Sequence, residues 1–221
     1  MKKILLIGGR GISEVFVRLL KKHNIPNIYL ISSSYKNSKI NSKMLTKKYK
    51  VTVSPSHNLD ILQVKSSIDA VIIASPNYSH QNYLSYFIKS GINILCEKPL
   101  FWQKDISAKS INEYFRFLEK NKTANLFLNT PNRFFAKAVK KQLLNISDSN
   151  SFELTFNTHG GEKSQNIGID LLPHAFSVLH ELYGFEPITQ ISLKCSTNQF
   201  NAKFKFGNIN VSLYLSENIN K

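Results

Sequence analysis

The sequence has 221 residues, enough for one large domain or two smaller ones with their own hydrophobic cores. Hydrophobic residues make up 42% and charged residues 19% of it, which excludes a disordered chain, and no apolar run approaches the ~20 residues that a membrane span needs. The formal net charge is +15, but the lysines are dispersed and no basic and aromatic residues interleave, so we expect attraction for anionic ligands and no nucleic-acid binding.

Two cysteines, Cys96 and Cys195, are too few for a disulfide framework and have no metal-ligand spacing. Cys96 ends an apolar run, where a small buried hydrophobic residue is expected. The N-terminal stretch MKKILLIGGRG has too short an apolar run for a signal peptide and is interpreted as a first core strand. We therefore expect a cytoplasmic protein without a bound metal.

Apolar strands and amphipathic helices alternate through the first half of the chain. The run 68–75 is apolar throughout, as expected for a parallel strand covered on both faces. Strict alternation implies a doubly wound parallel sheet, so residues 1–129 are predicted to form a dinucleotide-binding Rossmann domain. Strands are predicted at 3–8, 27–32, 50–54, 68–75, 92–97 and 124–129, and helices at 14–23, 35–50, 80–91 and 104–121.

The second half changes character. Several of its segments alternate apolar and polar residues with a period of two, and Phe206-Gly207-Asn208 resembles a hairpin turn. Residues 130–221 are therefore predicted to form an abbreviated α+β domain for substrate binding and oligomerisation, with a mainly antiparallel sheet. Helices are predicted at 134–145 and 171–183, and strands at 151–158, 188–194, 201–206 and 209–215.

A glycine-rich segment, GGRGIS at 8–13, lies between the first strand and the first helix. The pyrophosphate of a dinucleotide binds at this place in a doubly wound sheet. As a GxGxxG motif the match is imperfect, because a frame that starts at Gly8 or at Gly9 loses one or more of the later glycines. A plain tight turn is the alternative. The candidate cofactor-binding residues here are Gly8, Gly9, Arg10, Gly11 and Ile12.

The second strand is followed by SSSYK. Binders of NAD place an Asp or Glu near this position, whereas a 2′-phosphate prefers hydroxyl groups and a cation. Ser32, Ser33, Ser34 and Lys36 therefore favour NADP over NAD as the cofactor. The alternative is an ordinary polar loop.

The segment 74–100 contains several motifs in register: Ser75-Pro76-Asn77, then His80, Gly91 and Glu97-Lys98-Pro99. It resembles the Gfo/Idh/MocA oxidoreductases, whose signature is a strand, T-P-N-x-x-H, a helix, G-K-H-V and E-K-P. NTPNRF at 129–134 resembles the Asn-x-x-x-Arg-Phe strand end of that family. The resemblance implies that the Lys98–Pro99 bond can be cis. It also implies a cofactor site that includes Ser75, Pro76, Asn77, His80, Glu97 and Lys98.

A second match, IGIDLLPHAFSVLHELYG at 167–184, resembles the helix that carries the D-x-x-x-H pair of the family. Asp170 and His174 lie one helical turn apart and share a face. Because proline is tolerated in the first turn of a helix, Pro173 predicts that the helix begins near Asp170. The structural alternative is that Asp170 is the N-cap and His174 a core or interface histidine.

The resemblance implies hydride transfer between nicotinamide C4 and a carbon that bears a hydroxyl, carbonyl or imine group. The expected catalytic residues are Lys98, which would orient the substrate oxygen, His174, which would donate or accept a proton, and Asp170, which would orient one of them. A sugar or nucleotide sugar is the expected small-molecule substrate. The alternative is a catalytically idle dinucleotide-binding sensor or subunit, which the imperfect glycine segment favours.

Members of the family continue the second sheet beyond the point where this sequence ends. We therefore expect either a naturally short member or a truncated chain. The strands beyond that point help to form the sheet face used for oligomerisation, so the expectation is a homodimer through the second-domain sheet and no standard tetramer.

Overall fold

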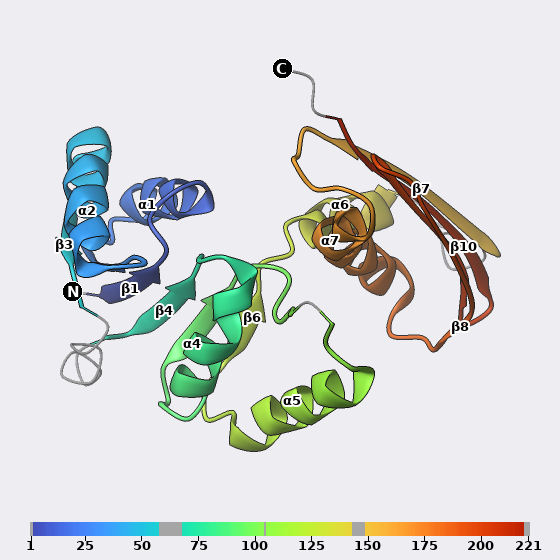
Figure 1. Ribbon diagram of the computed structural model, residues 1–221, viewed down its shortest axis with the longest axis horizontal. Coiled ribbons are helices and arrows are strands. Elements are labelled where there is room, and N and C mark those ends of the chain that lie inside the picture. Colours follow the sequence, from blue (N-terminus) through green and yellow to red (C-terminus); the bar gives the residue numbers. More distant parts are fainter. Residues whose placement is uncertain (1, 58–67, 104, 143–148, 219–221) are drawn as a thin grey trace. The chain divides into compact units, whose positions relative to one another are not determined.

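The computed structural model describes residues 2–57, 68–103, 105–142 and 149–218. The chain divides into two compact units, Met1–Asn129 and Thr130–Lys221 (Figure 1). Each unit has its own sheet, its own helices and two hydrophobic clusters of its own, and each is described separately below.

The first unit contains a six-stranded parallel sheet in the order β3-β2-β1-β4-β5-β6. The order reverses direction between β1 and β4, the arrangement of a doubly wound sheet. The predicted parallel Rossmann sheet is confirmed. Its strands are β1 (Lys3–Ile7), β2 (Asn27–Ile31), β3 (Thr52–Pro55), β4 (Ala70–Ile73), β5 (Asn93–Cys96) and β6 (Leu126–Leu128).

Helices cover both faces of this sheet, which explains why its central strands are apolar throughout. On one face, Phe16 and Leu45 pack against Leu6 and Leu30, and on the other Phe87 and Leu118 pack near Leu5. The helices are α1 (Ile12–Lys22), α2 (Tyr35–Tyr49), the 3₁₀ turn η3 (Asn77–Ser79), α4 (His80–Phe87) and α5 (Ala108–Asn121).

Two predicted helix boundaries in this unit were wrong by four residues. α4 ends at Phe87 and not at Gly91, because both the backbone and the hydroxyl of Ser90 donate to the Phe87 carbonyl and close the helix early. α5 begins at Ala108, since Ser107 caps it by accepting the Ser110 amide. Residue 104, where that helix was predicted to start, lies outside the described residues.

The second unit contains a four-stranded sheet in the order β7-β10-β9-β8. β9 pairs antiparallel with β8 and β10, while β7 and β10 are parallel, so the prediction of a mainly antiparallel sheet is confirmed. The predicted hairpin turn has Gly207 at φ 58°. The elements are α6 (Asn132–Gln142), β7 (Ser151–Thr158), α7 (Gln165–Tyr183), β8 (Ile188–Cys195), β9 (Gln199–Phe206) and β10 (Ile209–Glu217). Residues 143–145 of the predicted helix 134–145 lie outside the described part of the chain.

The start of α7 corrects the prediction that this helix begins near Asp170. It begins at Gln165, so Pro173 lies inside the helix and Asp170 is not its N-cap. Proline at 173 removes the amide that would donate to the Ile169 carbonyl. The burial of Ile167 and Leu171 against the sheet offsets that loss and keeps the first turns helical.

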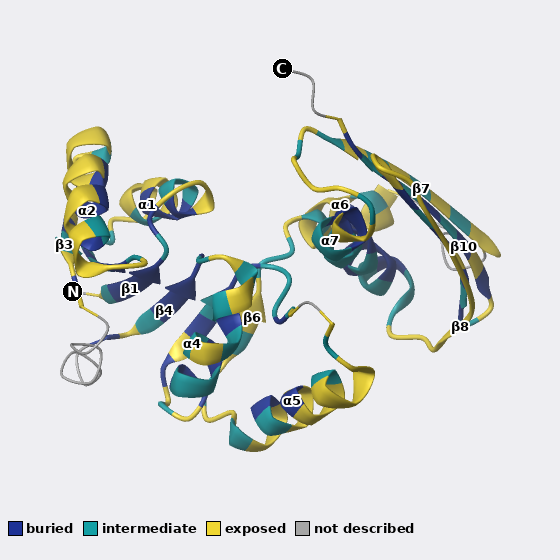
Figure 2. Cartoon of the chain, viewed as in Figure 1, coloured by how far each residue is buried: buried dark blue, intermediate teal, exposed yellow. Residues whose placement is uncertain are grey.

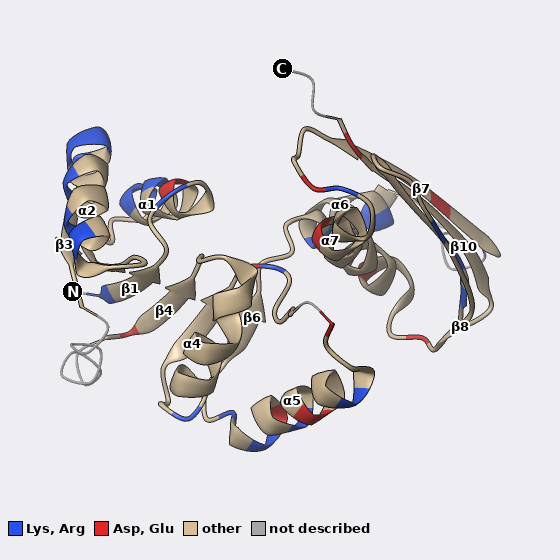
Figure 3. Ribbon diagram, viewed as in Figure 1, with Lys and Arg blue, Asp and Glu red and all other residues tan. Residues whose placement is uncertain are grey.

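Side chains alternate between core and solvent along β9 and β10, whereas every residue of β8 is exposed (Figure 2). α7 covers one face of the sheet and packs against β9 and β10. In the first unit the basic residues lie mainly on helices such as α2, whereas in the second unit they are divided between α6 and the strands β8 and β9 (Figure 3). None of the helices in the described ranges has the length and apolar character of a membrane span.

Candidate functional site

The candidate residues of the first unit follow the carboxyl ends of its parallel strands. The segments 8–12, 32–34, 75–80 and 97–98 come directly after β1, β2, β4 and β5. The central pair of these strands, β1 and β4, is the point where the strand order reverses. Ligands of doubly wound proteins bind outside this point, so the topology brings these segments to the expected edge of the sheet.

Two glycines after β1 have no room for a side chain. A Cβ on Gly8 would lie 2.5 Å from the Ala74 carbonyl oxygen, and Gly8 has φ +139°. A Cβ on Gly9 would lie 2.6 Å from Asn41 Nδ2. At Gly11, by contrast, φ is +55° and nothing lies within 4 Å of the Cβ position. The backbone at the N-terminus of α1 is therefore open to an approaching group, as close contact with a phosphate would require.

A hydrogen-bonded network, missed by the sequence analysis apart from Ser32, supports this segment. Ser32 Oγ donates to the Gly8 carbonyl at 2.8 Å, and Asn41 Nδ2 donates to Ser32 Oγ at 3.1 Å. Ser13 Oγ accepts the Gly9 amide at 3.0 Å. Ser32 therefore faces the glycine segment. The available signal was weak: Ser13 directly precedes the predicted helix 14–23, and Asn41 is a polar residue within the predicted helix 35–50.

The next two serines have a different environment. Ser33 and Ser34 are exposed at the start of α2, and Ser34 caps that helix by accepting the Asn37 amide at 3.1 Å. The first turn of α2 contains no acidic residue, and the exposed Lys36 and Lys39 follow. A helix N-terminus with hydroxyl groups and lysines beside it is electrostatically suited to an anion.

His80 links the segments after β4 and β5. Its side chain is buried, with 1% exposure, and its ring nitrogens Nδ1 and Nε2 lie 2.9 Å from the Pro99 carbonyl oxygen and 2.8 Å from the Ser75 carbonyl oxygen. The ring thus connects the segment Ser75-Pro76-Asn77 to the segment Glu97-Lys98-Pro99. Both of its nitrogens are used in this way, which makes His80 a support of the site.

Glu97 and Lys98 directly follow β5 and differ in how deeply their side chains are buried. Glu97 is buried, and its Oε1 accepts a hydrogen bond of 2.6 Å from Asn129 Nδ2, at the end of β6. Lys98 is half-buried, and the Lys98–Pro99 peptide bond is cis. Asn129 is a supporting residue that the sequence analysis did not assign to the site, although its place at the end of the predicted strand 124–129 was a usable signal.

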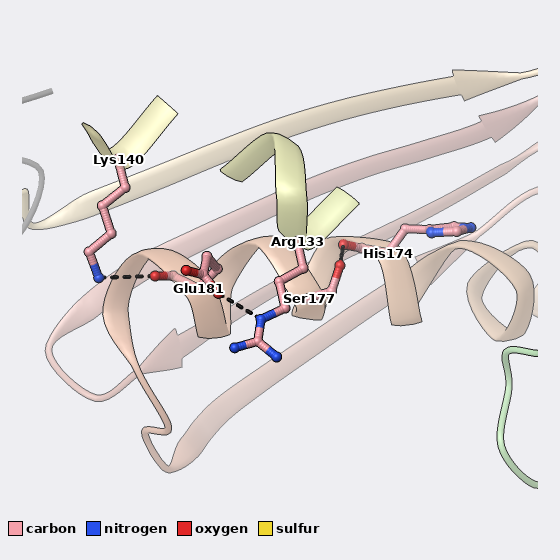
Figure 4. Close-up of polar contacts among 5 residues, drawn as sticks. All are labelled: Arg133, Lys140, His174, Ser177 and Glu181. Carbon is pink, nitrogen blue, oxygen red and sulfur yellow. Dashed lines mark hydrogen bonds and ion pairs between the residues drawn. The ribbon is translucent and has the colours of Figure 1, made fainter. Parts of the chain in front are cut away.

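The candidate residues of the second unit lie on α7. Asp170 and His174 are both half-buried and one turn apart. The His174 ring packs against Phe156 of β7 at 5.8 Å between centroids, and the His174 carbonyl accepts the Ser177 hydroxyl at 2.7 Å (Figure 4). His180, one and a half turns further on, contacts the rings of Phe176, Phe185 and Phe206, and burial lowers its pKa.

An ion pair joins α6 to the end of α7. Arg133 Nε donates to Glu181 Oε2 at 2.7 Å, and Lys140 Nζ donates to the Glu181 carbonyl at 3.0 Å (Figure 4). The Arg133 guanidinium is the main reason that the pKa of Glu181 is lowered. Arg133, from the segment 129–134 that resembles the family motif, thus supports the helix that carries Asp170 and His174.

Glu217, at the end of β10, is a further carboxyl group that the sequence analysis missed. It is 2% exposed, and its Oε2 accepts the Glu162 amide at 2.7 Å. A side-chain hydrogen bond links it to Asp170. Burial, followed by the charge on Asp170, raises its pKa. The signal in the sequence was its place at an inward position of a strand that otherwise alternates between apolar and polar residues.

The structure thus gathers the candidate cofactor-binding residues and Lys98 at one sheet edge of the first unit, and Asp170 and His174 on one helix of the second. No group of three or more His, Cys, Asp or Glu suited to a metal ion occurs among the residues with described positions.

Residues 2–129 match the model of an oxidoreductase family with an NAD-binding Rossmann fold, GFO_IDH_MocA. An inositol 2-dehydrogenase of Rhizobium meliloti is 26% identical over 141 residues, which cover 59% of this chain and 41% of that protein. A 2,7-anhydro-N-acetylneuraminate hydratase of Mediterraneibacter gnavus is 28% identical over 88 residues, which cover 40% of this chain and 22% of that protein. The matched stretches span less than half the length of these curated relatives.

Solved structures show the same fold at low sequence identity. The WlbA (WbpB) dehydrogenase of Thermus thermophilus, in complex with NAD and UDP-GlcNAcA, has a TM-score of 0.72 at 17% identity, over 98% of this chain and 74% of that one. KijD10, a 3-ketoreductase of Actinomadura kijaniata in complex with TDP-benzene and NADP, has a TM-score of 0.71 at 16% identity, over 98% of this chain and 69% of that one.

Proposed function

The chain belongs to the Gfo/Idh/MocA oxidoreductase family, and we propose that it is an NAD(P)-dependent oxidoreductase acting on a sugar, a nucleotide sugar or a related hydroxyl, carbonyl or imine compound. The observation that carries the proposal is the arrangement of the Glu97-Lys98-Pro99 segment. It follows β5 at the carboxyl edge of the sheet, where it is held by His80 and Asn129, and the glycine segment follows β1 at the same edge.

The cofactor would bind along that edge. The open backbone at Gly11 and the N-terminus of α1 would hold the pyrophosphate, with Arg10, which is exposed, as a counter-charge. Ser75, Pro76 and Asn77 after β4 would line the nicotinamide half, next to Lys98. The bound dinucleotide supplies or accepts the hydride at its nicotinamide C4.

We expect NADP to bind more tightly than NAD. The support is the exposed start of α2, where Ser33, Ser34 and Lys36 offer hydroxyl groups and a cation and the first turn has no carboxylate. A 2′-phosphate is stabilised in such surroundings, whereas NAD binders use a carboxylate to hold the ribose hydroxyl.

Lys98 would donate a hydrogen bond to the reacting substrate oxygen and stabilise the negative charge that develops on it. His174 would move a proton to or from that oxygen, the task for which imidazole is suited near neutral pH. Asp170, one turn before His174 on the same helix, would fix the orientation of the histidine. These roles follow from the residue types and from the family resemblance.

The choice of substrate class rests on the relatives. The inositol dehydrogenase acts on a polyol, and the WlbA structure holds a nucleotide sugar. Both bear the secondary hydroxyl groups that hydride transfer to a nicotinamide requires. We further propose a cytoplasmic protein, consistent with a buried free thiol at Cys96, and a homodimer through the sheet of the second unit, where β8 exposes Ile191 and Leu193.

The test is turnover by the purified protein with NADPH or NADH and a panel of inositols, sugars and nucleotide sugars with their keto forms, followed by nicotinamide absorbance. Lys98→Met should lower kcat on the order of a hundredfold or more and change the cofactor Kd only slightly, because the lost charge acts mainly in the transition state. Lys89→Met, which removes an exposed lysine of the same unit, is the control. A protein that binds the cofactor but turns over no member of the panel would instead be the idle dinucleotide-binding subunit.

A further inference from the structure

The inward row of β10 ends in a carboxyl group. Val211, Leu213 and Leu215 occupy successive inward positions with at most 2% exposure, and Glu217 occupies the next one, also with 2% exposure. An ionised carboxylate at such a position is costly unless it is paired and hydrogen-bonded. The groups around Glu217 therefore decide whether its carboxyl group is ionised or protonated in the folded protein.

Three contacts surround the Glu217 carboxyl. Its Oε2 accepts the Glu162 amide at 2.7 Å. Gly160 packs so closely that a Cβ there would lie 1.9 Å from Oε2. The third contact is the side-chain hydrogen bond to Asp170 of α7. The charged groups that act on Glu217 from these elements, Asp170 and Glu162, are both acidic. An ionised Glu217 would need a cation as its partner, and these neighbours would instead repel its charge.

Two carboxyl groups can form a hydrogen bond only if one of them carries a proton. The proton belongs on the more deeply buried partner, because burial disfavours the ionised form. Glu217 is almost fully buried, while Asp170 is half-buried. Burial and the charge on Asp170 both raise the pKa of Glu217, in agreement with this assignment.

We propose that Glu217 is a positioning residue, protonated in the folded protein, which donates its carboxyl proton to Asp170 and thereby fixes the Asp170 carboxyl group one turn from His174. The positioning part rests on the proposed function, since it concerns the histidine expected to move the substrate proton. The protonation part concerns the folded chain alone. A Gln at 217 could make the same two contacts, with Nε2 donating to Asp170 and Oε1 accepting the Glu162 amide.

The protonation is tested by unfolding in denaturant as a function of pH, without cofactor or substrate. A carboxyl group with a raised pKa in the folded state contributes stability that is fully present below its unfolded pKa and is lost as pH rises through the folded pKa. The wild-type protein should lose this contribution above about pH 4.3, and Glu217→Gln should remove that part of the profile. Glu153→Gln, which removes an exposed carboxylate of β7, should keep it. A Glu217→Gln profile identical to wild type overturns the proposal.

The positioning role is tested by kinetics. Glu217→Ala should lower kcat about tenfold with an unchanged cofactor Kd, and Glu217→Gln should restore most of the loss, because it keeps both hydrogen bonds. The Glu217→Ala variant should also show a shifted pH profile of kcat, which a purely structural defect would not produce. A Gln variant as impaired as the Ala variant contradicts the proposal. If the wild-type protein turns over no substrate, the proposed function and the positioning role fail, while the unfolding profile still decides the protonation.

Discussion

The side chains of His80 and Asn129 hold the segment that carries Lys98. His80 reaches the carbonyls of Ser75 and Pro99, and Asn129 donates to Glu97. These three contacts come from residues that follow different strands, so each depends on the sheet being assembled first. Lys98 itself is only half-buried. Its position therefore depends on the contacts of His80 and Asn129 as well as on its place after β5.

His80→Ala should destabilise the first unit by about 2–4 kcal/mol, because it opens a cavity and leaves the Ser75 and Pro99 carbonyls without the imidazole that contacts them. It should also weaken cofactor binding, since Ser75-Pro76-Asn77 and Glu97-Lys98-Pro99 lose their link. Denaturant unfolding and calorimetric titration measure the two effects. His23→Ala, at the exposed end of α1, serves as the control. Wild-type stability and affinity in His80→Ala would show that the link is unimportant.

At the residue scale the sequence could predict which short motifs matter but not which of their members face a ligand. Ser32 and His80 stand within the recognised motifs, yet both use their side chains to support backbone. Glu217 escaped notice because its hydrogen bond to Asp170 joins positions far apart in the chain. Contacts of this kind depend on tertiary packing, for which a single sequence has no local signal.

Among the elements, the strands were predicted well and the helix ends less well. Apolar runs between glycines and polar residues define β1, β4 and β5, because strands covered on both faces leave a continuous pattern. Helix ends depend on weaker effects. The early end of α4 comes from the Ser90 hydroxyl, and the early start of α7 comes from burial that outweighs the cost of Pro173.

Pro173→Ala tests this account of α7. The substitution restores an amide that can donate to the Ile169 carbonyl, and it should stabilise the second unit by on the order of 1–3 kcal/mol. Thermal unfolding followed by circular dichroism should show a higher Tm. The matched control is Pro131→Ala, since Pro131 directly precedes α6 and interrupts no helical bond. A lower Tm for Pro173→Ala than for wild type would mean that packing of the proline ring dominates.

At the scale of the whole molecule, the second unit leaves a strand uncovered. All eight residues of β8 are exposed, including Ile191 at 61% and Leu193 at 56%. An exposed apolar edge strand is a ready surface for association. The high positive charge opposes association in general, so a dimer would need a specific apolar contact of this kind.

If β8 forms the dimer interface, Ile191→Asp should shift the protein from dimer to monomer in size-exclusion chromatography with light scattering. Ser192→Asp makes the same change in charge at the neighbouring polar position, which is not part of the apolar surface, and should leave the dimer intact. A wild-type monomer, or a dimer that survives Ile191→Asp, would contradict the proposed interface.

The most direct test of the proposed cofactor site is calorimetric titration of the wild-type protein with NADPH and with NADH. The arrangement of the glycine segment and the start of α2 predicts binding of both, with the tighter Kd for NADPH. Ser33→Asp should reverse the preference by about tenfold, because its carboxylate repels a 2′-phosphate and can hold a ribose hydroxyl. Absence of binding heat with either dinucleotide, at concentrations that saturate nicotinamide enzymes, would contradict the account.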